Sequence, residues 1–481
     1  MRVAIVGAGV GGIGAAVKLK RAGFADVTIF ERSSGPGGTW FDNHYPGAAC
    51  DIASHLYSYS FKLHDWKRTH GSQAEILEYL DEVIAEFGLA PHFRFDTTVT
   101  SVAWDEETAE YELTTETGQT QRFHAVISAL GQLNHPRHPD WPGLEEFRGP
   151  RFHTARWEHG HELTGRRVAV VGTGSTAAQV VPAIAPDVSH VYLFQREPGW
   201  VVPKDSYTYD ASQRARLRSA LAKRRERTRI YVRNELRIRA LDPDSKAQAE
   251  GRADCIAYLE SVVEDPELRA ALTPDYVFRC KRPVRSSDFY PTLTRENVTL
   301  VPHAVTRVTP SGIIDATGTE HEVDVIVTAT GFQPTNFLAT LEVVGRGGRS
   351  IHDAWAGEPE AFLGITYPGF SNFFMLYGPN TNSSTTSLIF VLECQADYVV
   401  RTLRRMVRKR ARAVDARPSF NAPYNRWIQK GLVDSAYNGA CNNYYRTASG
   451  RIVTNWPYTS VLYWALTKSF AGVSAGLVFS R

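Results

Sequence analysis

The sequence has few cysteines and almost no excess charge. Its 481 residues include five cysteines, no two of which form a C-x-x-C pair. An odd count without that spacing is typical of reduced thiols in a cytosolic protein and argues against a disulfide framework. The formal net charge is only +3, so no general attraction to nucleic acid or to an acidic surface is expected.

Long uncharged apolar runs are also missing. No run reaches the ~18 residues that a membrane-spanning helix needs, and the best candidate, residues 452–467, is interrupted by Asn455 and Pro457. The chain starts directly with the strand-like residues 3–6, so no signal peptide is expected. These absences predict a cytoplasmic protein without stable membrane insertion. The length of the chain suffices for two or three domains.

What the chain does contain is a repeated pattern. Residues 3–32 and residues 168–196 each read as strand, glycine turn, helix and strand, which is the βαβ unit of a dinucleotide-binding fold. Residues 131–150 are rich in Pro, His and Gly and read as a linker between the two units. Residues 210–265 are strongly charged and helical in pattern, which is typical of a solvated helical insertion.

The order of these segments predicts an α/β fold with two Rossmann-like dinucleotide-binding domains and a helical insertion. We expect residues 1–140 and 327–481 to form a discontinuous first domain. Residues 146–202 and 281–326 are expected to form the second domain, and residues 203–280 the insertion. A monomer or a small homo-oligomer is expected, and no metal.

The first glycine turn has the spacing G-x-G-x-x-G. Gly7 permits the tight turn, Gly9 lets backbone N–H groups approach a pyrophosphate, and Gly12 lets the helix pack closely on the strand. Glu31 closes the second strand, where a carboxylate accepts hydrogen bonds from a ribose hydroxyl. Turn, strands, helix and acid together predict a dinucleotide site.

A second glycine-rich loop follows this acid at once and favours FAD over NAD in the first site. The loop ends in Gly38, Thr39 and Trp40, and a loop at this place resembles the flavoprotein pattern in which it approaches FAD. Residues 329–332 and residues 377–380 resemble later flavoprotein segments, although each is also compatible with an ordinary turn.

The second glycine turn carries the variant that ends in alanine, with Gly172, Gly174 and Ala177. Its second strand ends in Arg196, where the first unit has an acid. An arginine binds a 2′-phosphate that a carboxylate would repel, so NADPH is favoured over NADH. Lys281 is expected to add a second positive charge, and the alternative for Arg196 is a solvated arginine at a strand end.

Several segments resemble the class B flavin monooxygenases, and specifically the type I Baeyer–Villiger monooxygenases. The family fingerprint F-x-G-x-x-x-H-x-x-x-W is matched by Phe147, Gly149, His153 and Trp157. The segments YPGAACD, which ends at Asp51, and Cys280-Lys281-Arg282-Pro283 also resemble family segments. Glu158 and Glu197 depart from the residues that the family usually has there.

The resemblance implies an enzyme that uses FAD, NADPH and O₂ to insert one oxygen atom beside a ketone carbonyl, giving an ester or lactone. The oxidising species would be an anionic peroxide on flavin carbon 4a, shielded from water. Arg282 would hold it anionic with a fixed positive charge, and Asp51 would orient and partly neutralise Arg282. His153 would be a hinge residue and not a proton-transfer group.

Three other functions share part of this sequence pattern. A flavin monooxygenase that oxidises amines or sulfides is disfavoured by Trp157, Asp51 and Arg282. A flavin disulfide reductase needs a cysteine pair at the flavin, and Cys50 has no sequence neighbour to pair with. The third is a non-catalytic protein that binds NADPH and flavin, which the fold alone leaves open.

Overall fold

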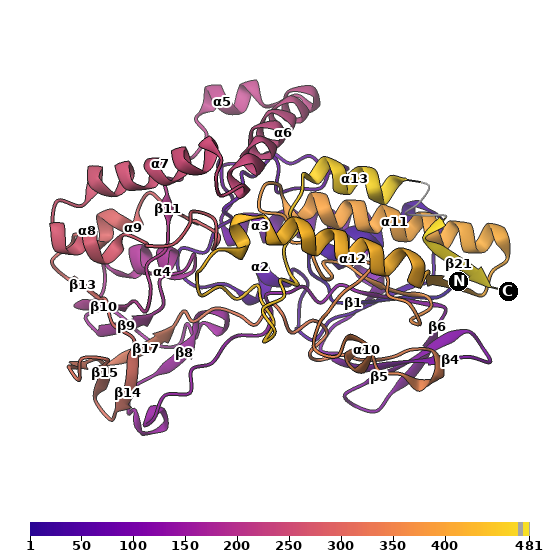
Figure 1. Ribbon diagram of the computed structural model, residues 1–481, viewed down its shortest axis with the longest axis horizontal. Coiled ribbons are helices and arrows are strands. Elements are labelled where there is room, and N and C mark those ends of the chain that lie inside the picture. Colours follow the sequence, from indigo (N-terminus) through magenta and orange to yellow (C-terminus); the bar gives the residue numbers. More distant parts are fainter. Residues whose placement is uncertain (470–474, 481) are drawn as a thin grey trace.

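The computed structural model describes residues 1–469 and 475–480. Two five-stranded parallel sheets form the centres of two α/β units, which lie on opposite sides of the molecule (Figure 1). The predicted fold class is therefore confirmed. The first sheet, in spatial order, consists of β19 (Phe373–Met375), β7 (Ala125–Ser128), β1 (Val3–Val6), β2 (Val27–Phe30) and β3 (Phe93–Arg94).

The central strand β1 is buried on both faces, as expected for a parallel sheet that is covered on both sides. Val3 and Ile5 belong to the core shared with the helices α1 (Val10–Arg21) and α11 (Leu388–Lys409). Ala4 and Val6 face the core shared with an antiparallel sheet. That sheet consists of β18 (Glu342–Val344), β4 (Val99–Asp105), β5 (Glu110–Thr115) and β6 (Thr120–Phe123).

The second parallel sheet repeats this plan. Its strands, in spatial order, are β13 (Val298–Val301), β10 (His190–Phe194), β9 (Arg167–Val171), β17 (Val325–Thr328) and β8 (Arg151–His153). The helices α4 (Ala177–Ile184) and α9 (Phe289–Leu293) share a core with one face. A small antiparallel sheet of β14 (Val305–Thr309), β15 (Gly312–Asp315) and β16 (Glu320–Glu322) shares a core with the other.

The predicted boundary between residues 326 and 327 falls inside β17, which pairs with β9 along its whole length. The strand belongs to the second sheet, and the backbone of its following turn is hydrogen-bonded to the linker residues 135 and 137. The pattern of a buried strand with a glycine turn does not say which sheet the strand joins. The predicted linker 131–150 is irregular apart from the short 3-10 helix η2 (Leu144–Glu146).

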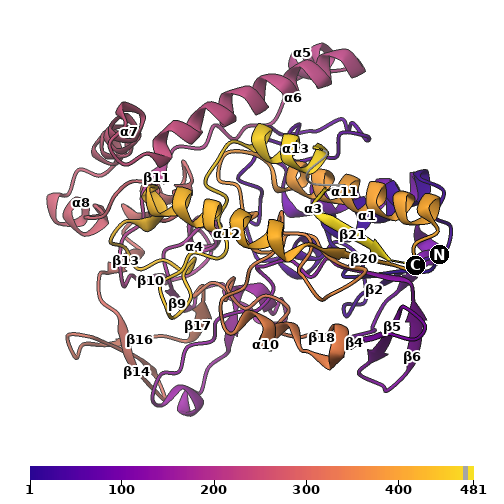
Figure 2. The ribbon, with the colours of Figure 1, turned by 45° about the vertical axis from the view of Figure 1, so that its right-hand side comes forward.

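Residues 211–272, which lie in the chain between β10 and β13, form a series of helices, the first two of which lie at the top of both views (Figures 1 and 2). They are α5 (Ala211–Arg216), α6 (Ala220–Glu235), the 3-10 helix η4 (Leu236–Leu241), α7 (Lys246–Val262) and α8 (Pro266–Leu272). Half of the residues of α6 are exposed and only Ile230 and Asn234 are buried, so the predicted helical insertion with a solvated, basic helix is present. Serines accept hydrogen bonds at the start of α6 and α7, which satisfies backbone N–H groups that a helix leaves free there.

Shorter elements complete the chain. The remaining helices are α2 (Thr39–Asp42), α3 (Gln73–Glu86), α10 (Ile351–Trp355), α12 (Pro418–Val433) and α13 (Ser460–Lys468). The remaining strands are β11 (Val201–Val202), β12 (Val284–Arg285), β20 (Ala413–Ala416) and β21 (Leu477–Ser480). The other 3-10 helices are η1 (Ala90–His92), η3 (Thr154–Arg156), η5 (Arg346–Gly348) and η6 (Ala436–Asn438).

The expectation of five reduced thiols is wrong for two of them. Cys280 and Cys441 form a disulfide, with Cα atoms 6.3 Å apart and a sequence separation of 161 residues. Such a pair has no local spacing, so nothing in the sequence pattern marks it. Cys50, Cys255 and Cys394 are free and buried.

The described residues contain neither a helix suited to a bilayer nor a cluster of metal ligands. None of their helices is both long enough and apolar enough to cross a bilayer. Within the same residues, no group of three or more His, Cys, Asp or Glu side chains is arranged to hold a metal ion.

Candidate active site

A cavity of about 370 Å³ lies at the carboxyl ends of the strands of the first sheet. Residues that directly follow β1, β2, β7 and β19 line it, which is where open α/β sheets bind their ligands. The second unit closes the cavity with Ser175, Thr176 and Gln179. The predicted residues on the cavity wall are Gly7, Gly9, Glu31, Gly38, Thr39, Trp40, Asp51 and Arg282.

The first glycine turn has no room for side chains. A Cβ atom on Gly7 would lie 2.6 Å from the carbonyl oxygen of Ala129, and one on Gly12 would lie 1.9 Å from the oxygen of Gly7. The second glycine loop contacts this turn, because a Cβ on Gly38 would lie 2.8 Å from Cα of Gly9. Only bare backbone fits here, so N–H groups line the narrow part of the cavity, as a pyrophosphate requires.

Glu31 brings a negative charge to the cavity wall, although its side chain is only 7% exposed. The carboxylate accepts hydrogen bonds from the backbone N–H of Ala8, at 2.7 Å, and of Ser33, at 2.9 Å. A carboxylate oxygen can accept more than one hydrogen bond, so Glu31 keeps capacity for a ribose hydroxyl. Trp40 donates to the hydroxyl of Tyr57 at 3.0 Å, which fixes the indole against the wall.

The second glycine turn is built in the same way but is open on one side. A Cβ on Gly172 would lie 2.5 Å from the carbonyl oxygen of Ala329, whereas one on Gly174 would meet no heavy atom within 4 Å. Ala177 begins α4 directly afterwards. The free space at Gly174 beside the start of a helix fits a bound phosphate.

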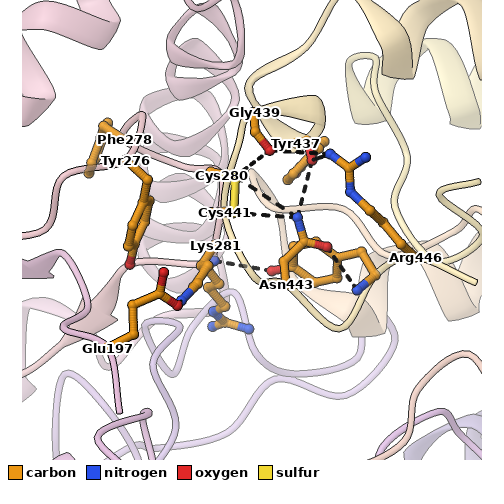
Figure 3. The surroundings of a disulfide bond; sticks show 12 residues. Glu197, Tyr276, Phe278, Cys280, Lys281, Tyr437, Gly439, Cys441, Asn443 and Arg446 are labelled. Atoms are coloured by element: carbon orange, nitrogen blue, oxygen red, sulfur yellow. Dashed lines mark hydrogen bonds and ion pairs between the residues drawn. A yellow bond between two sulfur atoms is a disulfide. The ribbon is translucent and has the colours of Figure 1, made fainter. Parts of the chain in front are cut away.

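Arg196 is exposed two residues after β10, which fits both a phosphate contact and the alternative of a solvated arginine at a strand end. Lys281 forms an ion pair with the carboxylate of Glu197 and lies over the ring of Tyr276. Figure 3 shows Glu197, Lys281 and Tyr276 together. Glu197 therefore already neutralises the second positive charge that was predicted near the 2′-phosphate.

Arg282 and Asp51 meet on the cavity wall. Nη2 of Arg282 lies 3.3 Å from Oδ2 of Asp51, and Nζ of Lys204 lies 3.8 Å from Oδ1. Asp51 is only 10% exposed, whereas Arg282 is 48% exposed because its guanidinium faces into the cavity. Burial is the largest single influence and acts to lower the pKa of Arg282, but the charge of Asp51 together with Tyr444, Tyr445 and Cys50 raises it by more, so the pKa rises. Arg282 is therefore a permanent cation.

A C-terminal loop fixes the position of Arg282. The backbone N–H of Arg282 donates to the hydroxyl of Tyr445 at 3.1 Å, and the backbone N–H of Tyr445 donates to Asn443 at 3.1 Å. Two residues before Arg282, Cys280 is joined to Cys441 in the same loop (Figure 3). Sequence reasoning missed Lys204, Tyr445 and Cys441, because no spacing connects them to the segment around Arg282.

The fingerprint residues lie behind the cavity. His153 is the last residue of β8 and is buried. Its Nδ1 accepts a hydrogen bond from the backbone N–H of Ala155 at 3.0 Å. Its ring contacts the ring of Phe332 edge to face. Burial is the main cause that lowers the pKa of His153 to about 4, so the ring is neutral near pH 7. Phe332 lines the cavity. His153 thus supports the cavity wall from the second sheet.

Cys50 lies in the cavity wall but is free and buried. Burial raises its pKa to about 12, so little thiolate forms near neutral pH. A disulfide reductase requires a reactive cysteine pair at the flavin, and this cysteine lacks both a disulfide partner and a thiolate.

The fold and site define a flavoprotein oxidoreductase with one dinucleotide site in each α/β unit. In agreement, a family profile described as pyridine nucleotide-disulphide oxidoreductase matches residues 4–255. A Baeyer–Villiger monooxygenase of Streptomyces coelicolor is 41% identical over 464 residues, which cover 96% of this chain and 89% of the relative. Another, of Pseudomonas aeruginosa, is 37% identical over 473 residues, which cover 98% and 90%.

Solved structures agree as well. A steroid monooxygenase bound to NADP has a TM-score of 0.90 and 31% identity, with 100% of this chain and 99% of that chain covered. A cyclohexanone monooxygenase from Rhodococcus sp. Phi1, bound to NADP⁺, gives the same values. The chain belongs to the Baeyer–Villiger monooxygenase family, and it is an NADPH-dependent FAD monooxygenase.

Proposed function

We propose that the protein converts a ketone into an ester or lactone, with Arg282 and Asp51 as the residues that act at the reacting atoms. The balanced reaction consumes the ketone, O₂, NADPH and a proton, and gives the ester, NADP⁺ and water. The observation that carries the proposal is the ion pair between Arg282 and Asp51 on the wall of the cavity that both dinucleotide units border. FAD, reduced by NADPH, supplies the activation of O₂ when it is bound.

The guanidinium of Arg282 does not lose its proton. It lies where negative charge develops on oxygen during attack on the ketone carbonyl. Where bound cofactor and substrate displace water from the cavity, such a charge acts more strongly than in solution. Asp51 orients the guanidinium and, together with Lys204, keeps the local charge balanced. Tyr445 is a positioning residue, since it contacts the backbone of Arg282 and not its guanidinium.

The cofactor roles follow from the same geometry. Gly7, Gly9 and Gly12 form the turn for the FAD pyrophosphate, and Glu31 receives the ribose hydroxyl. The wall from Gly38 to Trp40 borders the rest of the FAD site. The residues proposed for NADPH are Gly172, Gly174, Ala177, Arg196 and Lys281.

The test is product analysis with purified protein, NADPH, O₂ and a panel of ketones, sulfides and amines. Ester or lactone, formed in proportion to NADPH consumed, is the expected result. Sulfoxide or hydroxylamine without ester would instead indicate the N- or S-oxygenating class. A yellow protein that consumes no NADPH would indicate a non-catalytic role.

We also propose the cytoplasm as its compartment and a monomer or small homo-oligomer as its assembly. Three reduced cysteines fit a reducing compartment. The bond between Cys280 and Cys441 would there belong to the minority of cytosolic disulfides. Size-exclusion chromatography with light scattering measures the assembly.

A further inference from the structure

One side chain of the second unit makes three hydrogen bonds to the segment that carries Asp51. This segment, residues 45–51, belongs to the first unit, whereas Gln179 lies in the first turn of α4 in the second unit. Oε1 of Gln179 accepts from the hydroxyl of Tyr45, at 3.0 Å, and from the backbone N–H of Ala49, at 3.3 Å. Its Nε2 donates to the backbone carbonyl of Ala49 at 3.0 Å. The contact therefore joins the two dinucleotide units.

These bonds use both ends of the side-chain amide. The oxygen of Gln179 accepts two hydrogen bonds, which its two lone pairs allow. Because the amide also donates to the carbonyl of Ala49 while it accepts from the N–H of the same residue, it pairs with Ala49 as a neighbouring strand would. An apolar side chain of equal length cannot form these bonds, so packing alone does not explain a glutamine here.

The backbone of the segment packs closely on α4. A Cβ atom on Gly47 would lie 2.5 Å from the carbonyl oxygen of Gln179 and 3.1 Å from Cβ of Ala183, so the absence of a side chain permits this approach. On its other side, residues 48–50 form backbone hydrogen bonds with residues 71–73 of the first unit. The segment is thus held between the first unit and α4.

Asp51 follows Ala49 by two residues in this segment. Its Oδ2 lies 3.3 Å from Nη2 of Arg282, which is near the outer limit of a hydrogen bond. A displacement of the segment that lengthens this contact by about 1 Å would take the pair out of hydrogen-bond range. The place where Gln179 holds Ala49 therefore affects the pairing of Asp51 with Arg282.

Gln179 also lies next to the residues proposed for NADPH. Gly172 and Gly174 form the glycine turn, and Gln179 is the third residue of the helix that Ala177 begins. A phosphate at a helix N-terminus is bound by backbone N–H groups of the first turn. The backbone N–H of Gln179 donates to the carbonyl of Thr176 at 3.1 Å, so this turn is joined by its own hydrogen bonds. A coenzyme that fixes the turn therefore also fixes Gln179.

We propose that Gln179 is a positioning residue that couples an occupied NADPH site to the pairing of Asp51 with Arg282. Ordering of the first turn of α4 is transmitted through Gln179 to Ala49, and Asp51 is held beside Arg282. The guanidinium is thus oriented most firmly when the coenzyme is in place. This inference rests on the proposed function, since it uses the coenzyme site and the catalytic pair assigned there. No covalent bond changes, so the balance of the reaction is unaffected.

The main test variant is Gln179→Met. Methionine has a similar length and volume but lacks the donor and the strong acceptor of the amide. Tyr45→Phe removes one of the three hydrogen bonds and should act in the same direction with a smaller effect. Gln119→Met, at an exposed glutamine between β5 and β6 that is not part of the cavity wall, is the matched control.

Hydrogen–deuterium exchange of the FAD-loaded protein, with and without saturating NADP⁺, gives a readout that does not depend on turnover. In the parent and in Gln119→Met, NADP⁺ should slow exchange in peptides from residues 172–179 and, by roughly threefold or more, in those from residues 45–51. In Gln179→Met it should slow exchange only in residues 172–179. A merely structural role would change the exchange of residues 45–51 equally with and without NADP⁺.

Turnover gives the second readout. At saturating NADPH, and with the ketone of the panel that the parent converts best, ester formed per NADPH consumed should fall roughly three- to tenfold in Gln179→Met. The KM for NADPH should rise by no more than a similar factor, because the coupling between two binding events is reciprocal. Gln119→Met should match the parent in both quantities.

The outcomes separate this inference from the proposed function. Equal protection of residues 45–51 by NADP⁺ in Gln179→Met and in the parent overturns the inference, as does a lack of protection in the parent, and ester formation by the parent then still supports the proposed function. Loss of this protection in Gln179→Met, with no ester from any ketone in the parent, supports the coupling and overturns the proposed function. If Gln179→Met does not fold, Tyr45→Phe decides by the same exchange measurement.

Discussion

Oδ2 of Asp51 lies 3.3 Å from Nη2 of Arg282, and the two residues are 231 positions apart in the sequence. Asp51 is nearly buried and Arg282 faces the cavity. The guanidinium of Arg282 therefore faces the cavity, while the carboxylate of Asp51 holds it from the protein side. A cation held in this way is oriented without being hidden from a ligand.

Replacing Arg282 by alanine removes this cation. We expect NADPH to reduce the flavin at a rate within a few fold of the parent, while ester formation falls by roughly 100-fold or more. Arg282→Lys is the matched variant, and it should recover only part of the activity because an ammonium lacks the forked geometry. Stopped-flow flavin reduction and chromatography of the products measure the two steps. Ester formation by Arg282→Ala at the parent's rate would falsify the role of Arg282.

Replacing Glu31 by alanine tests the FAD site. The N–H groups of Ala8 and Ser33 would both lose their acceptor, and each unsatisfied buried donor costs about 1–3 kcal/mol. We expect protein purified as Glu31→Ala to contain far less flavin, measured as the ratio of absorbance at the flavin band to that of the protein. Glu31→Gln keeps one acceptor oxygen and should retain more FAD. Equal flavin content in Glu31→Ala and the parent contradicts the assignment.

These sites differ in how far the sequence predicts them. The two glycine turns are local, since every residue that forms them lies within one βαβ unit, so spacing alone indicates them. The pair of Asp51 and Arg282 joins distant segments, and it was expected only from the family resemblance. Its geometry comes from tertiary packing.

The parts that were not predicted depend on loops that are distant in sequence. Tyr445 and Cys441 reach the segment of Arg282 from a C-terminal loop with no regular pattern. Lys204 reaches Asp51 from the loop after β11. In the same way, β17 reads as a buried strand, but only the pairing with β9 shows that it belongs to the second sheet.

Replacing Glu197 by glutamine tests the coenzyme site. Lys281 would lose its ion-pair partner and would be free to meet the 2′-phosphate. We expect the KM for NADPH to fall severalfold, since a charge-assisted contact of this kind is worth about 1–3 kcal/mol at most. The KM for NADH, which has no 2′-phosphate, should not change. Arg196→Gln should have the opposite effect on NADPH alone, and a similar change for both coenzymes would exclude phosphate recognition by these residues.

The pH dependence of stability follows from two buried histidines. Burial is the main cause that lowers the pKa values of His55 and His153 to about 4, below the ordinary 6.5. The unfolded chain therefore binds protons before the folded chain does, so stability is complete above pH 6.5 and is lost as pH falls toward 4. Each histidine should contribute roughly 1–2 kcal/mol of this loss between pH 6.5 and 5.

Urea unfolding of the parent and of His55→Gln at pH 7 and pH 5 measures this effect. The variant carries no titrating group at position 55, so its free energy of unfolding should fall less between the two pH values. If parent and variant lose the same amount, His55 is not the source of the pH dependence.

Replacing Cys280 and Cys441 by serine tests whether the disulfide holds the Arg282 segment. The bond closes a loop of 161 positions, and loss of a disulfide typically costs about 2–5 kcal/mol. We expect a lower melting temperature and less ester formed per NADPH consumed, because the loop of Tyr445 would no longer be tied beside Arg282. Dithiothreitol should have the same effect on the parent and none on the variant. Alkylation followed by mass spectrometry provides the direct check: if both cysteines of the untreated parent are labelled without reductant, the bond is not formed and Tyr445 alone positions Arg282.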